Sequence, residues 1–255
     1  MSTFVTFFRH GESSNKEAVG SGLTQKGICQ VEKNAHTLSI SVSHGSHVVL
    51  YSSPRARAQD TMGIVSRVIA EQGVSVPGTY SVISGLDEVQ GFTWDPLLRS
   101  LVKGGAAVFS DDIYEIDPAI TNPLSLSAEN YFDSDFCHNP ELFAEARTKL
   151  PAGYLLYVDA METAKSVTKR FIDVLRMFEG YYGGTSTHVI MAGHYASTVF
   201  AVETFSGGTI NGLDTGESMD MILFDGKLFV TRVGALTLGC SHEDLFSLYD
   251  KGLIC

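Results

Sequence analysis

Apolar residues recur along the chain in two alternating patterns, short unbroken runs and longer stretches with helical spacing. The unbroken runs predict buried strands at 3–8, 48–52, 80–83 and 188–192. The helically spaced stretches predict helices at 25–38, 57–71, 163–178 and 195–205. Two further runs, 218–224 and 228–233, flank Asp225-Gly226, a dipeptide typical of a two-residue hairpin.

This alternation predicts an α/β fold, a three-layer α/β/α sandwich with a mostly parallel sheet and an antiparallel edge. Residues 92–160 interrupt the pattern, with prolines at 96, 118, 123, 140 and 151. We interpret them as a large irregular insertion over the active site. The chain is then a single domain, 1–255, and 92–160 form an insertion or lid within it.

Composition narrows the choice of function classes. The 255 residues include 18 Lys and Arg against 29 Asp and Glu, a net charge of −11. Nucleic-acid and anionic-membrane binders need a basic surface, so we expect neither partner. The four cysteines are widely spaced, which favours reduced thiols, and the first eight residues lack the basic region of a signal peptide. We therefore expect a cytoplasmic protein.

Residues capable of chemistry follow each of the predicted parallel strands. They are Arg9, His10, Arg55, Arg57, Glu88 and His194. The carboxyl ends of strands in an open α/β sheet form the edge where ligands bind. Two imidazoles, with guanidiniums whose planar donors suit phosphate, are expected to converge there on one tetrahedral anion.

The same residues lie in segments that resemble the histidine phosphatase superfamily, branch 1, the phosphoglycerate-mutase-like proteins. Phe8 to Ser13 looks like the family's RHGES signature, and Ser52 to Thr61 is similar to its SSPLxRAxQT segment. Leu86-x-Glu88 resembles the segment that carries the acid, and Gly193-His194 resembles the second histidine. The resemblance covers most of the chain except the insertion.

The resemblance implies phosphoryl transfer through a phosphohistidine. His10 is then the nucleophile, and Arg9, Arg57 and protonated His194 hold the phosphoryl oxygens. Glu88 serves as general acid and then as general base. Asn15 and Ser218 are weaker candidates for substrate positioning. We expect no cofactor and no metal, because positioned cations take that role and the remaining histidines form no ligand-like cluster.

The chain departs from the family's motifs at two residues and carries one further match. Asn15 stands five residues after the nucleophile instead of six, and Asp60 replaces a glutamine. Tyr195 follows the second histidine where the acid-phosphatase branch has aspartate, so we place the chain in the mutase-like branch. Glu162 and Arg170 match a family helix that we interpret as structural.

Residues 104–146 contain nine acidic residues and no Lys or Arg. Over the active site they would repel polyanionic substrates, which favours a phosphatase acting on a small or partly apolar phosphomonoester. A phosphoglycerate-type mutase and a phosphoprotein phosphatase with phosphopeptide substrates remain alternatives. An alternative of another class is a catalytically idle interaction protein that docks through the acidic insertion. We expect a monomer or homodimer.

Overall fold

The computed structural model describes residues 2–13, 22–42, 46–87, 106–109, 112–115, 164–198, 201–202, 212–238 and 244–254. The chain divides into two compact units, Met1–Glu88 with Thr168–Cys255, and Val89–Val167. The predicted insertion 92–160 falls in the second unit. There the described residues include two short antiparallel strands, β4 (Ala106–Phe109) and β5 (Asp112–Glu115), so the segment is not irregular throughout. The single-domain assignment and the lid stay predictions.

The first unit is built on one seven-stranded sheet. Its strands are β1 (Thr3–Arg9), β2 (His47–Ser52), β3 (Ser81–Val82), β6 (Thr187–Gly193), β7 (Ser218–Phe224), β8 (Lys227–Val233) and β9 (Leu236–Thr237). Their order is β3-β2-β6-β1-β7-β8-β9. The first four strands pair in parallel, and the rest join antiparallel beyond β1. The predicted α/β sheet with a parallel centre and an antiparallel edge is confirmed.

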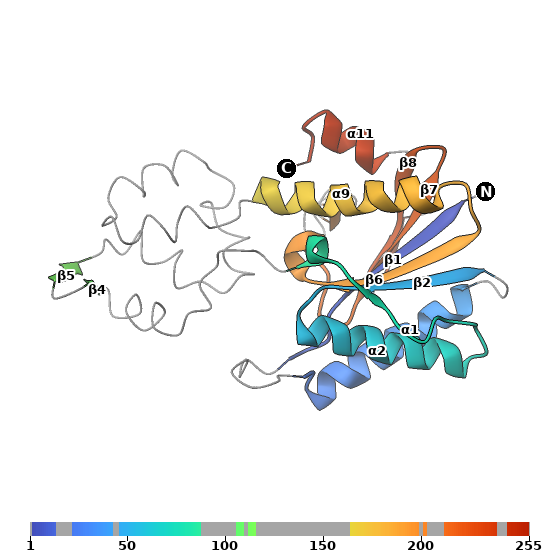
Figure 1. Ribbon diagram of the computed structural model, residues 1–255, viewed down its shortest axis with the longest axis horizontal. Coiled ribbons are helices and arrows are strands. Elements are labelled where there is room, and N and C mark those ends of the chain that lie inside the picture. Colours follow the sequence, from blue (N-terminus) through green and yellow to red (C-terminus); the bar gives the residue numbers. More distant parts are fainter. Residues whose placement is uncertain are drawn as a thin grey trace. The chain divides into compact units, whose positions relative to one another are not determined.

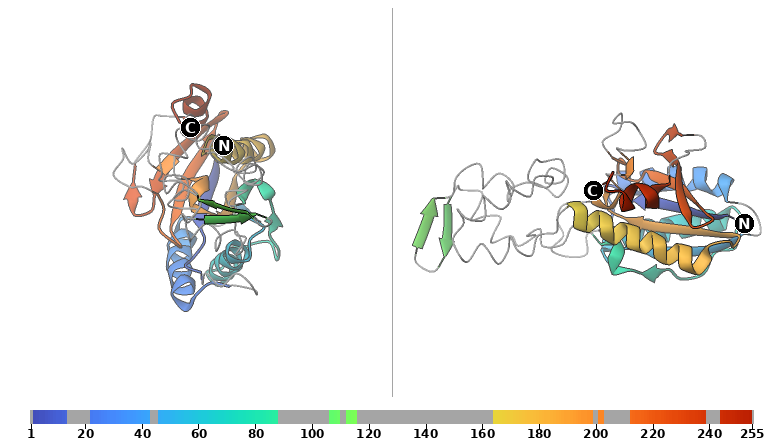
Figure 2. Two further views of the ribbon diagram at one scale, coloured as in Figure 1. Left: turned by 90° about the vertical axis from the view of Figure 1, so that its left-hand side faces the viewer. Right: turned by 90° about the horizontal axis from the view of Figure 1, so that it is seen from above.

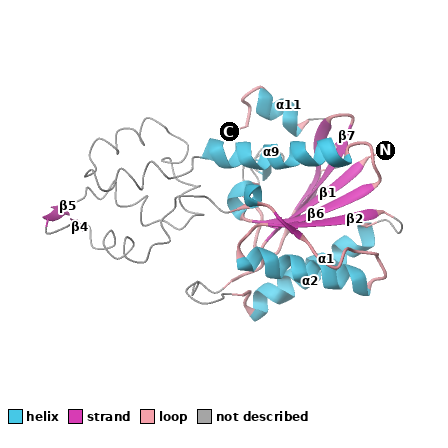
Figure 3. Ribbon diagram, in the orientation of Figure 1, coloured by secondary structure: helices cyan, strands magenta, loops and turns pink. Residues whose placement is uncertain are grey.

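Helices cover both faces of this sheet, as Figures 1 and 3 show. One side carries α1 (Gln25–Ser41) and α2 (Ala56–Glu71), and the other carries α9 (Ala164–Tyr182) and α11 (Leu245–Asp250). The end-on view in Figure 2 shows the same three layers. Neighbouring residues of β1 point to opposite faces, so Phe8 packs in the core under α1 and α2. Phe7 packs in the other core, with its ring edge-on to Phe171 at 5.6 Å.

Local signals in the sequence explain several element boundaries. Thr24 caps α1 through its hydroxyl, which accepts a hydrogen bond from the Gly27 amide. Beyond the end of α2, Gly73 has φ +82°, a conformation that glycine adopts without strain. Asp225 and Gly226 both have positive φ, as a two-residue hairpin between β7 and β8 requires.

The helix predicted at 195–205 differs most from the structure. Its described residues form a short 3-10 helix, Tyr195–Ser197, and helical backbone returns at 201–202. The remaining residues of that segment, 199–200 and 203–205, lie outside the described part of the chain. The sequence analysis did not predict β9 or α11, whose two and six residues are too short for a periodic pattern.

Candidate active site

The ends of β1 and β6 bring the two candidate histidines together. The strands pair in register, and the His10 amide donates to the Gly193 carbonyl at 3.0 Å. His194 follows directly, and the centroids of the His10 and His194 rings lie 5.1 Å apart. Both rings are buried. Residues 184 positions apart in sequence therefore share one site because their strands are neighbours.

The His10 ring has a defined protonation state. Its Nδ1 lies 2.8 Å from the Gly11 carbonyl oxygen, which can only accept, so Nδ1 carries the hydrogen. Burial and the charge of Arg57 lower the pKa of His10 to about 3, with a smaller contribution from Arg9, against the Gly11 hydrogen bond. At neutral pH the ring is therefore uncharged, and Nε2 carries a lone pair.

His194 is held by a serine from the second strand. Its Nε2 lies 2.9 Å from the Ser53 hydroxyl. Its Nδ1 is buried and makes no hydrogen bond to the described residues. Burial is the main cause that holds the pKa of His194 well below 6.5, and the neighbouring His10 and Arg57 add to it. A buried nitrogen that lacks a hydrogen-bond partner lowers the stability of the folded protein, and a ligand oxygen could provide that partner.

The two arginines of the second-strand segment have different surroundings. Arg57, on the first turn of α2, is 7% exposed, and its charge lowers the pKa of both candidate histidines. Arg55 instead pairs with Asp87, with Nε 2.7 Å from the carboxylate. Of the two, Arg57 is the guanidinium that acts on both rings while sharing their burial.

Arg9 approaches the site from the end of β1. Its guanidinium is buried, donates to the Leu213 carbonyl at 2.6 Å, and lies 5.0 Å from the centre of the Tyr195 ring. Its backbone is fixed as well, because its amide donates to Glu217 and its carbonyl accepts from Gly216. Sequence reasoning gave Tyr195 no part in the site and did not anticipate the contacts that Leu213, Gly216 and Glu217 make with Arg9.

Ser218, a candidate for substrate positioning, opens β7 opposite Phe8. Its side chain is buried, and its hydroxyl accepts a hydrogen bond from Arg232 at 2.7 Å. Arg232 also pairs with Asp220 at 2.7 Å. The described contact of Ser218 is therefore with the antiparallel edge of the sheet.

Two predicted site residues, Glu88 and Asn15, lie outside the described residues. The chain is described up to Asp87, and two arginines hold that end. Arg170 of α9 donates to the carbonyls of Ser84, Gly85 and Asp87 at 3.0–3.3 Å, and Arg55 holds the Asp87 carboxylate. The segment that leads to Glu88 is thus anchored to α9 and to the start of α2.

The structure brings helix α1 close to Gly11, the residue that follows His10. A Cβ on Gly11 would lie 2.6 Å from the Gly27 carbonyl of α1, and one on Gly27 would lie 2.1 Å from the Glu12 carbonyl. The Gly11 amide also donates to the Thr61 hydroxyl of α2. The two glycines therefore let α1 pack directly against the loop that carries His10.

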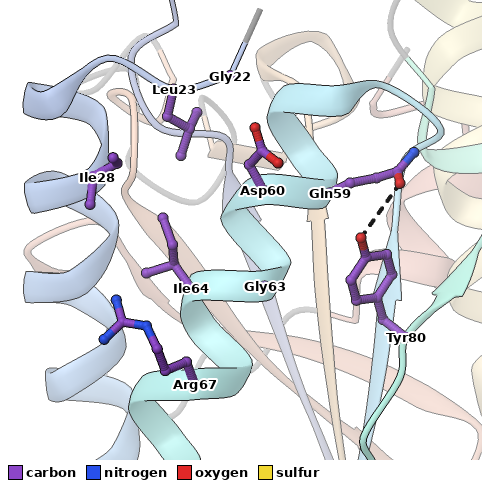
Figure 4. A pocket seen from close by; sticks show the side chains of 9 residues that line it. All are labelled: Gly22, Leu23, Ile28, Gln59, Asp60, Gly63, Ile64, Arg67 and Tyr80. Carbon is purple, nitrogen blue, oxygen red and sulfur yellow. Dashed lines mark hydrogen bonds between the residues drawn. The ribbon is translucent and has the colours of Figure 1, made fainter. Parts of the chain in front are cut away.

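A separate pocket of about 500 Å³ lies between α1 and α2 (Figure 4). Asp60, which replaces the family glutamine, lines it together with Ile64, Arg67 and Tyr80. The Tyr80 hydroxyl lies 3.5 Å from Gln59. No candidate catalytic or phosphate-binding residue lines this pocket, so we do not assign it to the chemistry.

The described residues contain neither a metal-binding cluster nor a membrane-spanning helix. No group of three or more His, Cys, Asp or Glu side chains there could hold a metal ion. No helix in that part of the chain is long and apolar enough to cross a bilayer.

Known proteins share this fold and part of this sequence. Residues 5–98 match the model of the histidine phosphatase superfamily (branch 1). A phosphoglycerate mutase from Bacillus anthracis str. Sterne has 19% identity and a TM-score of 0.56, covering 91% of this chain and 93% of its own. Comparison with curated protein sequences finds no match.

Two phosphatase structures are also similar, with slightly lower TM-scores. The alpha-ribazole phosphatase from Shigella flexneri has 17% identity and a TM-score of 0.51, covering 94% of this chain and 99% of its own. A mycobacterial glucosyl-3-phosphoglycerate phosphatase has 13% identity and a TM-score of 0.52, covering 87% and 91%. Residues 5–98 of this chain therefore match the histidine phosphatase superfamily (branch 1), and the solved structures show that the chain shares the fold of these proteins.

Proposed function

We propose that this protein is a phosphomonoester hydrolase that works through a phosphohistidine on His10. The observation that carries the proposal is the state of that ring. Its Nδ1 hydrogen is held by the Gly11 carbonyl, its pKa is lowered to about 3, and His194 lies 5.1 Å away. A neutral imidazole with a free lone pair, beside buried guanidiniums, is suited to attack an anionic phosphorus centre.

The chemistry proceeds in two displacements. The Nε2 lone pair of His10 forms a bond to phosphorus while the bond to the leaving oxygen breaks, and Glu88 donates its proton to that oxygen. Glu88 then takes a proton from water, whose oxygen attacks the same phosphorus. The bond between phosphorus and Nε2 breaks, inorganic phosphate is released, and neutral His10 is regenerated. Arg9 and Arg57 offset the charge on the phosphoryl oxygens in both steps.

His194 changes charge during this cycle. Its surroundings hold it neutral in the free protein. A phosphate dianion in contact with it favours the protonated ring and opposes the effect of burial. Its Nδ1, which makes no hydrogen bond within the described part of the chain, is the atom available to donate to a phosphoryl oxygen. Protonated His194 is therefore a property of the complex.

We propose a small or partly apolar phosphomonoester as the substrate class. The support is the sequence of residues 104–146, which holds nine acidic residues and no Lys or Arg to receive a second phosphate or a carboxylate. Mutase activity, phosphopeptide hydrolysis and a catalytically idle protein are the competing outcomes of the test below. Cytoplasmic location and a monomeric or dimeric state stay predictions.

Hydrolysis of p-nitrophenyl phosphate, with inhibition by vanadate, tests the proposal. We expect turnover in the wild type, none through the covalent route in His10→Ala, and full activity in the control His36→Ala, which changes an exposed histidine on α1. An inactive wild type, or an active His10→Ala, would overturn the proposal. A panel of phosphorylated metabolites and phosphopeptides then ranks substrates. Rapid formation of 2-phosphoglycerate from 3-phosphoglycerate and a bisphosphate primer would favour the mutase.

A further inference from the structure

Tyr195 lies against Arg9 at the edge of the proposed phosphate site. The central carbon of the Arg9 guanidinium is 5.0 Å from the centre of the Tyr195 ring. At this distance a cation is attracted to the electron-rich face of an aromatic ring. The contact is partly buried, because Arg9 is 8% exposed, and loss of water strengthens such an interaction.

The position of the Tyr195 ring is itself constrained. A Cβ placed on Gly212 would stand 2.0 Å from ring atom Cε2, so the backbone of that residue packs directly on the ring. Gly212 also has φ +145°, which side-chain-bearing residues rarely adopt. The next residue, Leu213, provides the carbonyl that accepts from Arg9 Nη1 at 2.6 Å. One short stretch of backbone therefore holds both the ring and one end of the guanidinium.

The surroundings of Arg9 explain why such a restraint matters. Arg9 and Tyr195 line a pocket of about 440 Å³ together with two acidic residues, Asp214 and Glu217. Within one pocket, carboxylates attract a guanidinium. An arginine that turned towards them would no longer face a phosphoryl group. The flat ring and the Leu213 carbonyl favour one orientation over that alternative.

We propose that Tyr195 is a positioning residue that keeps the Arg9 guanidinium aimed at the phosphoryl oxygens. The inference rests on the proposed function, since it concerns the same anion site. Tyr195 acts through Arg9, and its ring face, not its hydroxyl, carries the effect. Removing the ring weakens the binding of a phosphate-like anion by about 5- to 30-fold, the range expected for a partly desolvated cation–π contact.

Calorimetric binding of vanadate to the full chain tests the role of the ring. Tyr195→Phe keeps the ring, so we expect an affinity within about twofold of the wild type. Tyr195→Leu loses the ring and is expected to bind about 5- to 30-fold more weakly. Phenylalanines with increasing fluorination at this position keep the shape of Tyr195→Phe but withdraw charge from the ring face. Their affinity should fall stepwise, which a packing role alone would not produce.

A double-mutant cycle with Arg9→Met identifies the partner of the ring. If Tyr195 acts through Arg9, Tyr195→Leu has no further effect on affinity once Arg9 is replaced. A wild type that binds no vanadate overturns the proposed function and this inference with it. A wild type that binds overturns this inference alone if Tyr195→Leu binds equally well, if fluorination has no effect, or if the loss persists in Arg9→Met.

Discussion

At the scale of single residues, the site depends on two histidines kept uncharged by their surroundings. His10 has a pKa of about 3, and that of His194 is lowered well below 6.5, chiefly by burial. An incoming anion reverses part of this effect, because it stabilises a protonated neighbour. The charge of the site is therefore coupled to occupancy.

This coupling predicts proton uptake on anion binding. At pH 8, binding of inorganic phosphate should draw protons from the buffer, because the complex favours protonated His194. Calorimetry in buffers of different ionisation enthalpy measures the number taken up. We expect about one proton fewer in His194→Gln than in the wild type, by the charge argument above. Equal uptake by both proteins would show that His194 stays neutral in the complex.

Sequence reasoning reached the strand-end residues because their positions follow from topology. His10 and His194 come directly after buried strands, and parallel strands end at one edge. The contacts that set their state were not accessible in the same way. The pairing of Arg55 with Asp87 and the stacking of Arg9 on Tyr195 join side chains from segments far apart in the sequence. Such contacts depend on how the ends of separate elements are arranged in space, which no periodic pattern in the sequence reports.

At the scale of elements, α9 supports the segment that leads to the candidate acid. Arg170 donates to three carbonyls of the turn that ends at Asp87. A resemblance to a family helix suggested a structural role, and these contacts identify the segment that Arg170 anchors. Arg176, on the same helix, pairs with Asp250 at the C-terminal helix α11.

Arg170→Met should therefore lower catalysis without weakening anion binding. We expect kcat to fall by at least about tenfold, since a displaced general acid loses part of a contribution of about 10²–10⁴. The vanadate dissociation constant should stay within about twofold. Arg176→Met is the control for loss of an arginine from α9, with kcat near that of the wild type. Equal kcat in both variants would remove α9 from the account of the acid.

Substitutions at two glycines, one in α1 and one in α2, distinguish the effect of packing from that of helix propensity. A Cβ on Gly27 would lie 2.1 Å from the Glu12 carbonyl oxygen, whereas a Cβ on Gly63 of α2 would have no neighbour within 4 Å among the described residues, apart from its chain neighbours and the helix backbone. Gly63→Ala should raise the free energy of unfolding by about 0.5–1 kcal/mol. Gly27→Ala should lower it and impair activity, because α1 would be pushed from the His10 loop. Denaturant unfolding measures both, and a stable, active Gly27→Ala would contradict the packing described here.

Patterns in the sequence predicted helices well where burial of one face determines the structure. Long amphipathic stretches predicted α1, α2 and α9 to within a few residues, because burial of one face dominates their stability. The stretch at 195–205 had comparable spacing, yet it begins as a 3-10 turn. There Tyr195 is held by Arg9 and Gly212, and a tertiary contact outweighs local preference.

At the scale of the whole molecule, buried neutral histidines make the fold sensitive to acid. His10, His188 and His194 all have pKa values below 6.5, that of His188 being about 4, where burial outweighs the charge of Asp220. Their unfolded forms bind protons that the folded forms do not. Stability is therefore fully present above about pH 6.5 and falls as the pH drops towards 4.

His188→Gln tests this dependence away from the proposed chemistry. His188 lies in β6, with its Nε2 2.9 Å from the Thr6 hydroxyl, a contact that an amide can replace. We expect the free energy of unfolding between pH 4 and 6 to change less steeply in the variant, by up to about 1.4 kcal/mol per pH unit. Denaturant unfolding at each pH provides the slope. An unchanged slope would mean that His188 is not held neutral in the folded protein.

The covalent intermediate is the most direct measurement of the central claim. Glu88→Gln incubated with 2,4-dinitrophenyl phosphate should form the phosphoenzyme, because this leaving group needs no acid, and should retain it, because the base is missing. Rapid quenching at alkaline pH and peptide mass spectrometry then locate the phosphoryl group. We predict acid-labile phosphate on the peptide that contains His10, and none in the double variant with His10→Ala. Phosphate on another residue, or turnover with no phosphoenzyme in the His10-containing protein, would contradict the account.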